Sequence, residues 1–316
     1  MSVQQSLPEE QRTAAHWTAP ASNIASTTCL FREYLQLTKP RIALLIVIST
    51  AVGFCFGALG GFDLVTLFHT LLGTALMAAG SATLNQWYER DVDSRMKRTR
   101  NRPIPAGTIP AAHALYFGVA TSLAGALELW LFANREAALL SCLTSFGYLF
   151  IYTPLKRKGP LCTTVGAIPG AMPPLIGFAA ARGHLALEAW ILFGILFLWQ
   201  FPHFHAIAWM YREDYGRGDI KMLAVVEPKG EALARQVILT LILLIPVTLA
   251  PTFVHMAGKV YFVAALLLGL AFLYFGVQIW RERTHQGARR LLLASVVYMP
   301  VLFAFLVFDS PRFPLL

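Results

Sequence analysis

Residues Leu64 to Pro103 read LVTLFHTLLGTALMAAGSATLNQWYERDVDSRMKRTRNRP; the first 21 contain no Asp, Glu, Lys or Arg, whereas nine of the last nineteen are charged. A helix that crosses a bilayer needs roughly 20 mainly apolar residues. The whole chain has 316 residues, of which 56% are hydrophobic and 14% charged, whereas soluble domains carry about a quarter charged residues. The sequence therefore predicts a membrane protein.

Eight further segments resemble the apolar part of this stretch in length and composition. We predict an all-α polytopic membrane protein with nine transmembrane helices, at residues 41–59, 64–86, 111–133, 136–153, 162–181, 187–211, 235–255, 259–280 and 290–309. Residues 1–33 are polar and predict a flexible cytoplasmic N-terminal arm, followed by one transmembrane domain at 34–316.

The Lys and Arg residues divide unevenly between the two sides of this arrangement. The N-terminal arm and every second loop hold 22 of the 26 cations, and the other side holds only Arg135, Arg182, Lys259 and Arg312. Because Lys and Arg mark the cytoplasmic side, we expect a cytoplasmic N-terminus and a periplasmic C-terminus. The net charge of +9 is then a consequence of topology, and we expect no nucleic-acid partner.

Asn85, Glu89 and Asp93 follow one another at four-residue spacing at the end of the second apolar segment. Residues spaced in this way share one face of a helix. Two carboxylates and an amide oxygen suit Mg2+, which prefers oxygen ligands and often binds together with substrate phosphates. The nearby cations suit phosphate oxygens. The alternative is an ordinary charged helix end at the membrane surface, which explains the cations but not the shared face.

A second polar cluster lies in WQFPHFHAIAWMYREDYGRGD, Trp199 to Asp219. Polar side chains within a membrane span usually face a cavity or a partner. His203 and Asp214 are eleven residues apart and share a face if the helix continues. The alternative for His203 is a hydrogen bond between helices, and for His205 we favour that interpretation.

A third cluster, YTPLKRKGPLCTT from Tyr152 to Thr164, places Lys156 and Arg157 at the same expected side of the membrane. Cations at this position are common on topological grounds alone. The segment becomes a candidate because it shares a side with the other two clusters.

The spacing Asn85-x3-Glu89-x3-Asp93, followed by Met96-x-Arg98-Thr99-x2-Arg102-Pro103, resembles the first acidic motif of the UbiA superfamily of membrane prenyltransferases. The segments YTPLKR, GAIPGAMPPLIG and WQFPHFHAIA resemble the haem-farnesylating branch of that superfamily. The resemblance extends over about residues 34–310 and implies a UbiA-type bundle of nine helices. Only Asp214 matches the second acidic motif of many members, since Asp219 is displaced, which leaves the remaining metal ligands open.

The resemblance implies transfer of the farnesyl group of farnesyl diphosphate to a vinyl group of haem B, with addition of water, giving haem O and diphosphate. Mg2+ is the implied cofactor, and its expected ligands are Asn85, Glu89, Asp93 and Asp214. The expected diphosphate contacts are Arg98, Arg102, Lys156 and Arg157. The expected haem or cation-stabilising side chains are His203, Tyr88, Tyr152 and Trp199.

The same resemblance implies an integral protein of the bacterial inner membrane, with lipid around it and an active site that faces the cytoplasm. Haem A synthase is a candidate partner that would use the product. Two other functions stay open: a UbiA-type prenyltransferase acting on an aromatic acid or quinone precursor, and a membrane transporter, because transporters also carry polar residues within broken helices.

Overall fold

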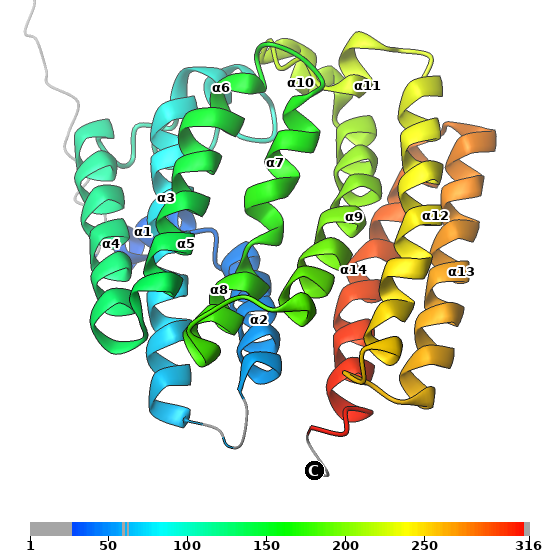
Figure 1. The fold of residues 1–316 in the computed structure, drawn as a ribbon. Coiled ribbons are helices and arrows are strands. Elements are labelled where there is room, and N and C mark those ends of the chain that lie inside the picture. The colour runs from blue at the N-terminus through cyan, green and yellow to red at the C-terminus, as the bar shows by residue number, and fades with distance from the viewer. Residues whose placement is uncertain (1–26, 59–60, 62, 313–316) are drawn as a thin grey trace, which may run out of the picture.

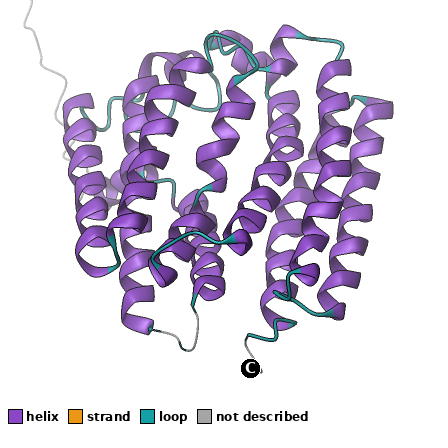
Figure 2. Cartoon of the chain, in the orientation of Figure 1, coloured by secondary structure: helices purple, strands orange, loops and turns teal. Residues whose placement is uncertain are grey.

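The computed structural model describes residues 27–58, 61 and 63–312, and every regular element among them is a helix (Figure 2). The elements follow one another as α1 (Thr27–Leu37), α2 (Pro40–Gly57), α3 (Leu64–Arg95), α4 (Ala111–Phe132), α5 (Arg135–Phe146), the π-helix η2 (Gly147–Tyr152), α6 (Thr153–Leu155), α7 (Cys162–Ala171), α8 (Pro173–Arg182), α9 (Leu187–Met210), α10 (Arg212–Arg217), α11 (Leu223–Val226), α12 (Glu231–Phe253), α13 (Lys259–Glu282) and α14 (His285–Phe308).

Within the described residues, nine spans are long and apolar enough to cross a membrane, which confirms the predicted number. Two are composite: Arg135–Leu155 combines α5, η2 and α6, and Cys162–Arg182 combines α7 and α8. The predicted apolar span 64–86 lies within α3, which continues as one helix to Arg95. The residues after Leu84 therefore stay on this helix, as the spacing of Asn85, Glu89 and Asp93 predicts.

The α3–α4 contact illustrates how the bundle packs. A Cβ atom at Gly80 of α3 would collide with Ser122 of α4. Small residues at helix interfaces let backbones approach closely in membranes, where dispersion contacts replace the hydrophobic effect between helices. The N-terminus of α3 is fixed by the Asp63 carboxylate, which accepts from the N–H groups of Val65 and Thr66 at 3.0 and 3.2 Å.

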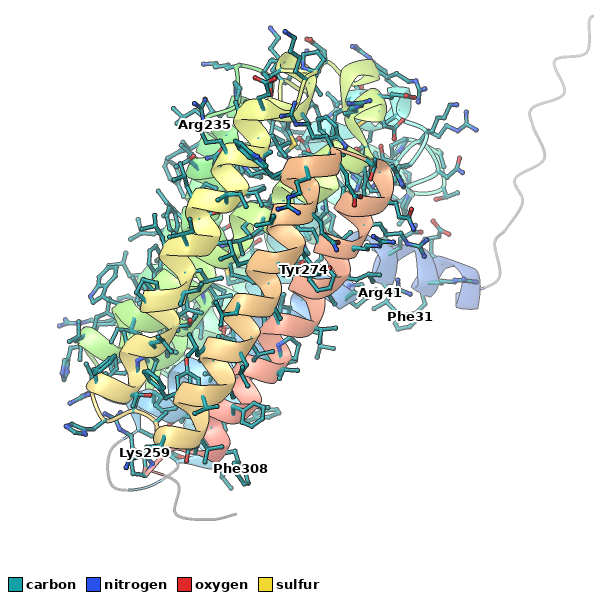
Figure 3. All side chains as sticks on the ribbon, turned by 90° about the vertical axis from the view of Figure 1, so that its right-hand side faces the viewer. Phe31, Arg41, Arg235, Lys259, Tyr274 and Phe308 are labelled. Carbon is teal, nitrogen blue, oxygen red and sulfur yellow. The ribbon has the colours of Figure 1, made fainter. Side chains whose placement is uncertain are left out.

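The two ends of the bundle differ in the length of their connections. The connection after α3 and the short helices α6, α10 and α11 gather at one end, the upper end of Figure 1, and the C-terminal end of α14 lies at the other. Figure 3 shows Arg235 at the first end and Lys259 and Phe308 at the second. The cation-rich connections thus lie together, while the end that faces the cytoplasm stays a prediction.

The helix α1 lies outside the spanning bundle. In Figure 3 it extends sideways from the bundle and carries the labelled Phe31, which is 70% exposed. It begins at Thr27 and so overlaps the last residues of the predicted 1–33 arm; residues 1–26 of that arm lie outside the described residues.

Candidate active site

The last three turns of α3 present one buried polar face. Asn85, Glu89 and Asp93 are only 2%, 9% and 1% exposed, in agreement with the shared face that their spacing predicts. The Asn85 amide donates to Glu89 Oε2 at 3.0 Å. Asp91, on another face, has a side chain that is 79% exposed. The helix therefore separates two inward carboxylates from a solvated one.

Glu89 is paired with Lys156, which follows α6. The Lys156 ammonium donates to both Glu89 carboxylate oxygens, at 2.8 and 2.9 Å, and lies 4.7 Å from the centre of the Tyr152 ring. Burial alone would lower the pKa of Lys156, but the Glu89 carboxylate outweighs it and holds this pKa above its usual value. This shift favours the charged ammonium that the predicted role of Lys156 in phosphate binding requires.

Asp93 is paired with Arg102 in the connection that follows α3. The Arg102 guanidinium donates to Asp93 Oδ2 at 2.7 Å, and the Thr99 hydroxyl donates to the Asp93 backbone carbonyl at 2.9 Å. These contacts fold the connection back over the end of α3. The segment from Met96 to Pro103 therefore places the Arg102 guanidinium against the acidic face of α3.

Two residues join the site without having been predicted. Lys39 donates to Asn85 Oδ1 at 3.3 Å, and the Asn85 amide donates to Thr153 Oγ1 at 3.2 Å. Burial, together with the nearby Arg102 and Lys156 charges, lowers the pKa of Lys39 to about 7. The one feature of the sequence that marks Lys39 is its position directly before Pro40, the first residue of α2. Lys39 precedes the helix in the left-handed backbone region, with a φ of 50°.

Thr153 owes its position to the π-helix that precedes it. Its hydroxyl donates to the Tyr148 carbonyl at 2.8 Å, while Tyr148 and Tyr152 stack with ring centres 5.6 Å apart. A Cβ atom at Gly166 would press on the Tyr152 ring, so the absence of a side chain there lets the ring fit. π-helical turns often occur at functional sites.

The cluster pairs the cations Arg102 and Lys156 with the carboxylates Asp93 and Glu89. Lys39 is a further amine beside them, and its protonation gives the cluster a formal excess of one positive charge, which suits an anion. Its carboxylate and amide oxygens are of the type that Mg2+ prefers, and Mg2+ commonly completes its coordination with substrate phosphates. Among the described residues no three His, Cys, Asp or Glu side chains converge on one metal position. A Mg2+ bound here would therefore need oxygen ligands from a phosphate or from water as well.

Asp214, in α10, binds the backbone of the connection that follows α3, at the same end of the bundle. Its carboxylate accepts from the backbone N–H groups of Lys97 and Arg98 at 2.7 and 3.0 Å, and from Arg217 at 3.0 Å. Burial favours the neutral acid, but these hydrogen bonds outweigh it and hold the pKa of Asp214 below its usual value. Asp214 thus connects α10 to the segment that follows α3, and its role as a metal ligand stays a prediction.

His203 and Asp214 were expected to share a helix face only if the helix continued, and it does not continue. The backbone leaves the helical conformation at Tyr211, with φ −113° and ψ 21°, and α10 begins anew at Arg212.

Within the described part of the chain, the remaining predicted cations form ion pairs with neither Glu89 nor Asp93. The Arg98 guanidinium lies 4.8 and 5.5 Å from the ring centres of Tyr211 and Tyr215 and donates to the Tyr215 hydroxyl at 3.3 Å. Arg157 is exposed. Both stay predictions as diphosphate contacts.

The predicted aromatic and His residues fall in two places. Tyr152 lies against Lys156, whereas Tyr88 is 49% exposed on α3. Trp199 and His203 form a separate group on α9, stacked with ring centres 4.9 Å apart. His205 is 1% exposed and its Nε2 lies 3.0 Å from Gln236 Oε1, which agrees with the interpretation of His205 as a link between helices.

The site lies in an all-helical membrane bundle, with paired acids and cations at the end of the second span. Among known protein families, the UbiA prenyltransferase family matches residues 46–306 of this chain. The chain belongs to the UbiA prenyltransferase family. This assignment agrees with the superfamily that the acidic motif indicates.

Relatives in the UbiA family share most of their length with this chain. A protoheme IX farnesyltransferase of Solibacter usitatus is 53% identical over 289 residues, covering 89% of this chain and 99% of the relative. Another of the same name, from Koribacter versatilis, is 45% identical and covers 92% of this chain and 96% of the relative.

Solved structures show the UbiA fold for this chain. A digeranylgeranylglyceryl phosphate synthase gives a TM-score of 0.75 at 15% identity, covering 90% of this chain and 99% of that one. A UbiA homologue from Archaeoglobus fulgidus bound to GPP and Mg2+ gives 0.59 at 21% identity, covering 87% and 99%. These likenesses confirm the predicted nine-helix UbiA-type architecture.

Proposed function

We propose that this chain transfers the farnesyl group of farnesyl diphosphate to a vinyl group of haem B, with addition of water, giving haem O and diphosphate. The observation that carries the proposal is the buried charge-paired face of α3, where Glu89 and Asp93 meet Lys156 and Arg102. The relatives named protoheme IX farnesyltransferase, at 53% and 45% identity, support haem as the acceptor rather than an aromatic acid, and an enzyme rather than a transporter.

We assign Mg2+ to the oxygens of Asn85, Glu89 and Asp93, with Asp214 as a further predicted ligand. When bound there, Mg2+ would act as a Lewis acid on the diphosphate leaving group. A solved UbiA homologue of the same fold contains GPP and Mg2+.

The chain's own cations act on the same leaving group. Lys156, Arg102 and Lys39 surround the carboxylates and lie within reach of phosphate oxygens that approach them. As the allylic C–O bond breaks, charge develops on the diphosphate, and prepositioned cations stabilise it by several kcal/mol in a water-poor site. Arg98 and Arg157 are candidates for outer phosphate contacts.

The allylic cation left behind must be protected from water. Tyr152 places its ring against the Lys156 ammonium at 4.7 Å, and we propose that the ring helps to exclude water from the reacting carbon. The haem vinyl group then attacks the allylic carbon, water adds to the resulting cation on the acceptor, and the proton that this water loses passes to the released diphosphate.

The nine spans among the described residues support a reaction at a membrane, where the farnesyl tail can stay in an apolar environment. We propose the bacterial inner membrane, with the charged end facing the cytoplasm, because that end carries the cation-rich connections. Haem A synthase is the proposed user of the product.

The direct test is purified protein in lipid nanodiscs with farnesyl diphosphate, Mg2+ and haem B, followed by mass spectrometry for haem O. We expect haem O from the wild type and from Asp91→Asn, the exposed control on the same helix. Asp93→Asn should lose at least about 100-fold in rate, in line with losing a main electrostatic contribution. A product only with a benzoate or naphthoate acceptor would replace the proposed substrate, and no diphosphate release with any acceptor would contradict prenyl transfer.

A further inference from the structure

His203, in the last two turns of α9, lies against Ser295 of α14. His203 Nδ1 is 2.8 Å from Ser295 Oγ. The Trp199 ring stacks on the imidazole with centres 4.9 Å apart and 26° between planes, and the Trp199 indole N–H donates to the Ser295 carbonyl at 2.9 Å. The imidazole is therefore held on one edge by Ser295 and over one face by Trp199.

The hydrogen atoms of this group can be assigned by counting donors. A Ser hydroxyl has one hydrogen to donate and can accept others. Ser295 Oγ lies 2.6 Å from the Leu292 carbonyl, a separation at which two oxygens need a hydrogen between them. That hydrogen belongs to Ser295, so Ser295 Oγ must accept from His203, and Nδ1 carries the proton.

The other ring nitrogen is then unprotonated. A neutral imidazole with its proton on Nδ1 has a lone pair on Nε2, and among the described residues Nε2 of His203 takes part in no hydrogen bond with the protein. His203 is also only partly buried, unlike His205, which is 1% exposed and uses Nε2 to contact Gln236. The interhelical hydrogen bond of His203 thus leaves the ligating nitrogen available.

We propose that Ser295 is a positioning residue that fixes the tautomer of His203, so that Nε2 is offered to the iron of the porphyrin substrate. The inference rests on the proposed function, which supplies haem B as the substrate. Metal-ligating His residues usually donate their other ring N–H to an oxygen acceptor, which fixes the ring and raises its basicity. Here the acceptor is a hydroxyl whose own hydrogen is committed to Leu292, so it cannot reverse its role.

The test is a spectroscopic titration of the full chain in nanodiscs, without farnesyl diphosphate, using ferric haem B and metal-free protoporphyrin IX as probes. Ser295→Ala should weaken haem B binding about 10–100-fold and change the absorption bands of the bound haem. Binding of the metal-free porphyrin should change little, because it has no iron to ligate. Ser295→Thr keeps the hydroxyl and should restore the wild-type spectrum.

Two further variants separate ligation from folding. Ser49→Ala removes a hydroxyl that is 1% exposed and bonds its own helix at Leu45, at 2.8 Å, so it should bind haem B like the wild type. His203→Ala should lose the same bands as Ser295→Ala and regain them when imidazole is added. Unfolding midpoints recorded in parallel identify any variant that fails to fold.

Wild-type haem B affinity and spectrum in Ser295→Ala or in His203→Ala would overturn the inference. Equal weakening of both porphyrins in Ser295→Ala would also overturn it, since Ser295 would then shape the pocket rather than act through the iron ligand. The proposed function is judged separately, by haem O formation in the wild type. If the wild type forms haem O but the haem spectrum does not depend on His203, the proposed function stands and the inference about Ser295 and His203 is contradicted.

Discussion

Lys156 Nζ lies 2.8 Å from Oε1 and 2.9 Å from Oε2 of Glu89, so one ammonium bridges both oxygens of a carboxylate 67 residues away in the chain. Both side chains are only 11% exposed. The pair fixes the segment after the π-helix against α3 and prepares a cation beside the predicted phosphate position.

A double-mutant cycle tests this pair. Lys156→Met leaves the buried Glu89 carboxylate without its cation, and we expect a loss of about 3 kcal/mol in the free energy of unfolding. The double variant Glu89→Gln/Lys156→Met should recover most of that loss, while haem O formation stays low in Lys156→Met and in the double variant. Unfolding in mixed micelles gives the free energies; strictly additive losses would show that the two groups do not interact.

Lys39 is expected to contribute to diphosphate binding rather than to folding. Lys39→Gln should weaken binding of inorganic diphosphate with Mg2+ by about tenfold, the change that corresponds to roughly 1.4 kcal/mol. Arg41→Gln, a neighbouring exposed cation, is the matched control and should bind normally. Calorimetric titration measures both, and equal affinities in the two variants would remove Lys39 from the site.

Limited proteolysis can distinguish two roles of Asp214: holding the backbone of Lys97 and Arg98, and binding a metal ion. Asp214→Ala removes the acceptor for the N–H groups of Lys97 and Arg98, so trypsin should cleave after these residues several-fold faster, even with Mg2+ absent. Glu213→Ala, whose side chain is 83% exposed, should leave cleavage unchanged. If Asp214 served only as a metal ligand, metal-free cleavage of Asp214→Ala would match the wild type.

Gly166 is predicted to set the position of Tyr152. A methyl group at this position would press on the ring, so Gly166→Ala should lower haem O formation by displacing the ring from Lys156. Gly159→Ala, where a Cβ atom meets nothing within 4 Å, is the control. Equal rates in the two variants would show that the ring position does not matter.

The features that the sequence predicts well are local ones. The nine spans follow from runs of apolar residues, and the shared face of Asn85, Glu89 and Asp93 follows from helical periodicity. Lys39 and Thr153 reach Asn85 across 46 and 68 residues, a contact that depends on how the helices pack. The alignment of His203 with Asp214 was expected only for a continuous helix, and the break between α9 and α10 at Tyr211 removes that condition.

The contacts of Arg98 with Tyr211 and Tyr215 could not be predicted from the sequence either, because they also depend on how distant segments pack. The predicted role of Arg98 came from its place among the six cations from Arg90 to Arg102, but its guanidinium packs against Tyr211 and Tyr215, which only tertiary structure brings near.

The most direct measurement is the stoichiometry of diphosphate release and haem O formation by the purified chain with farnesyl diphosphate, haem B and Mg2+. The account predicts that both products appear in equal amounts, that both need haem B, and that both fall together in Asp93→Asn but not in Asp91→Asn. Diphosphate release that does not depend on haem B, or haem O formation at wild-type rate by Asp93→Asn, would contradict it.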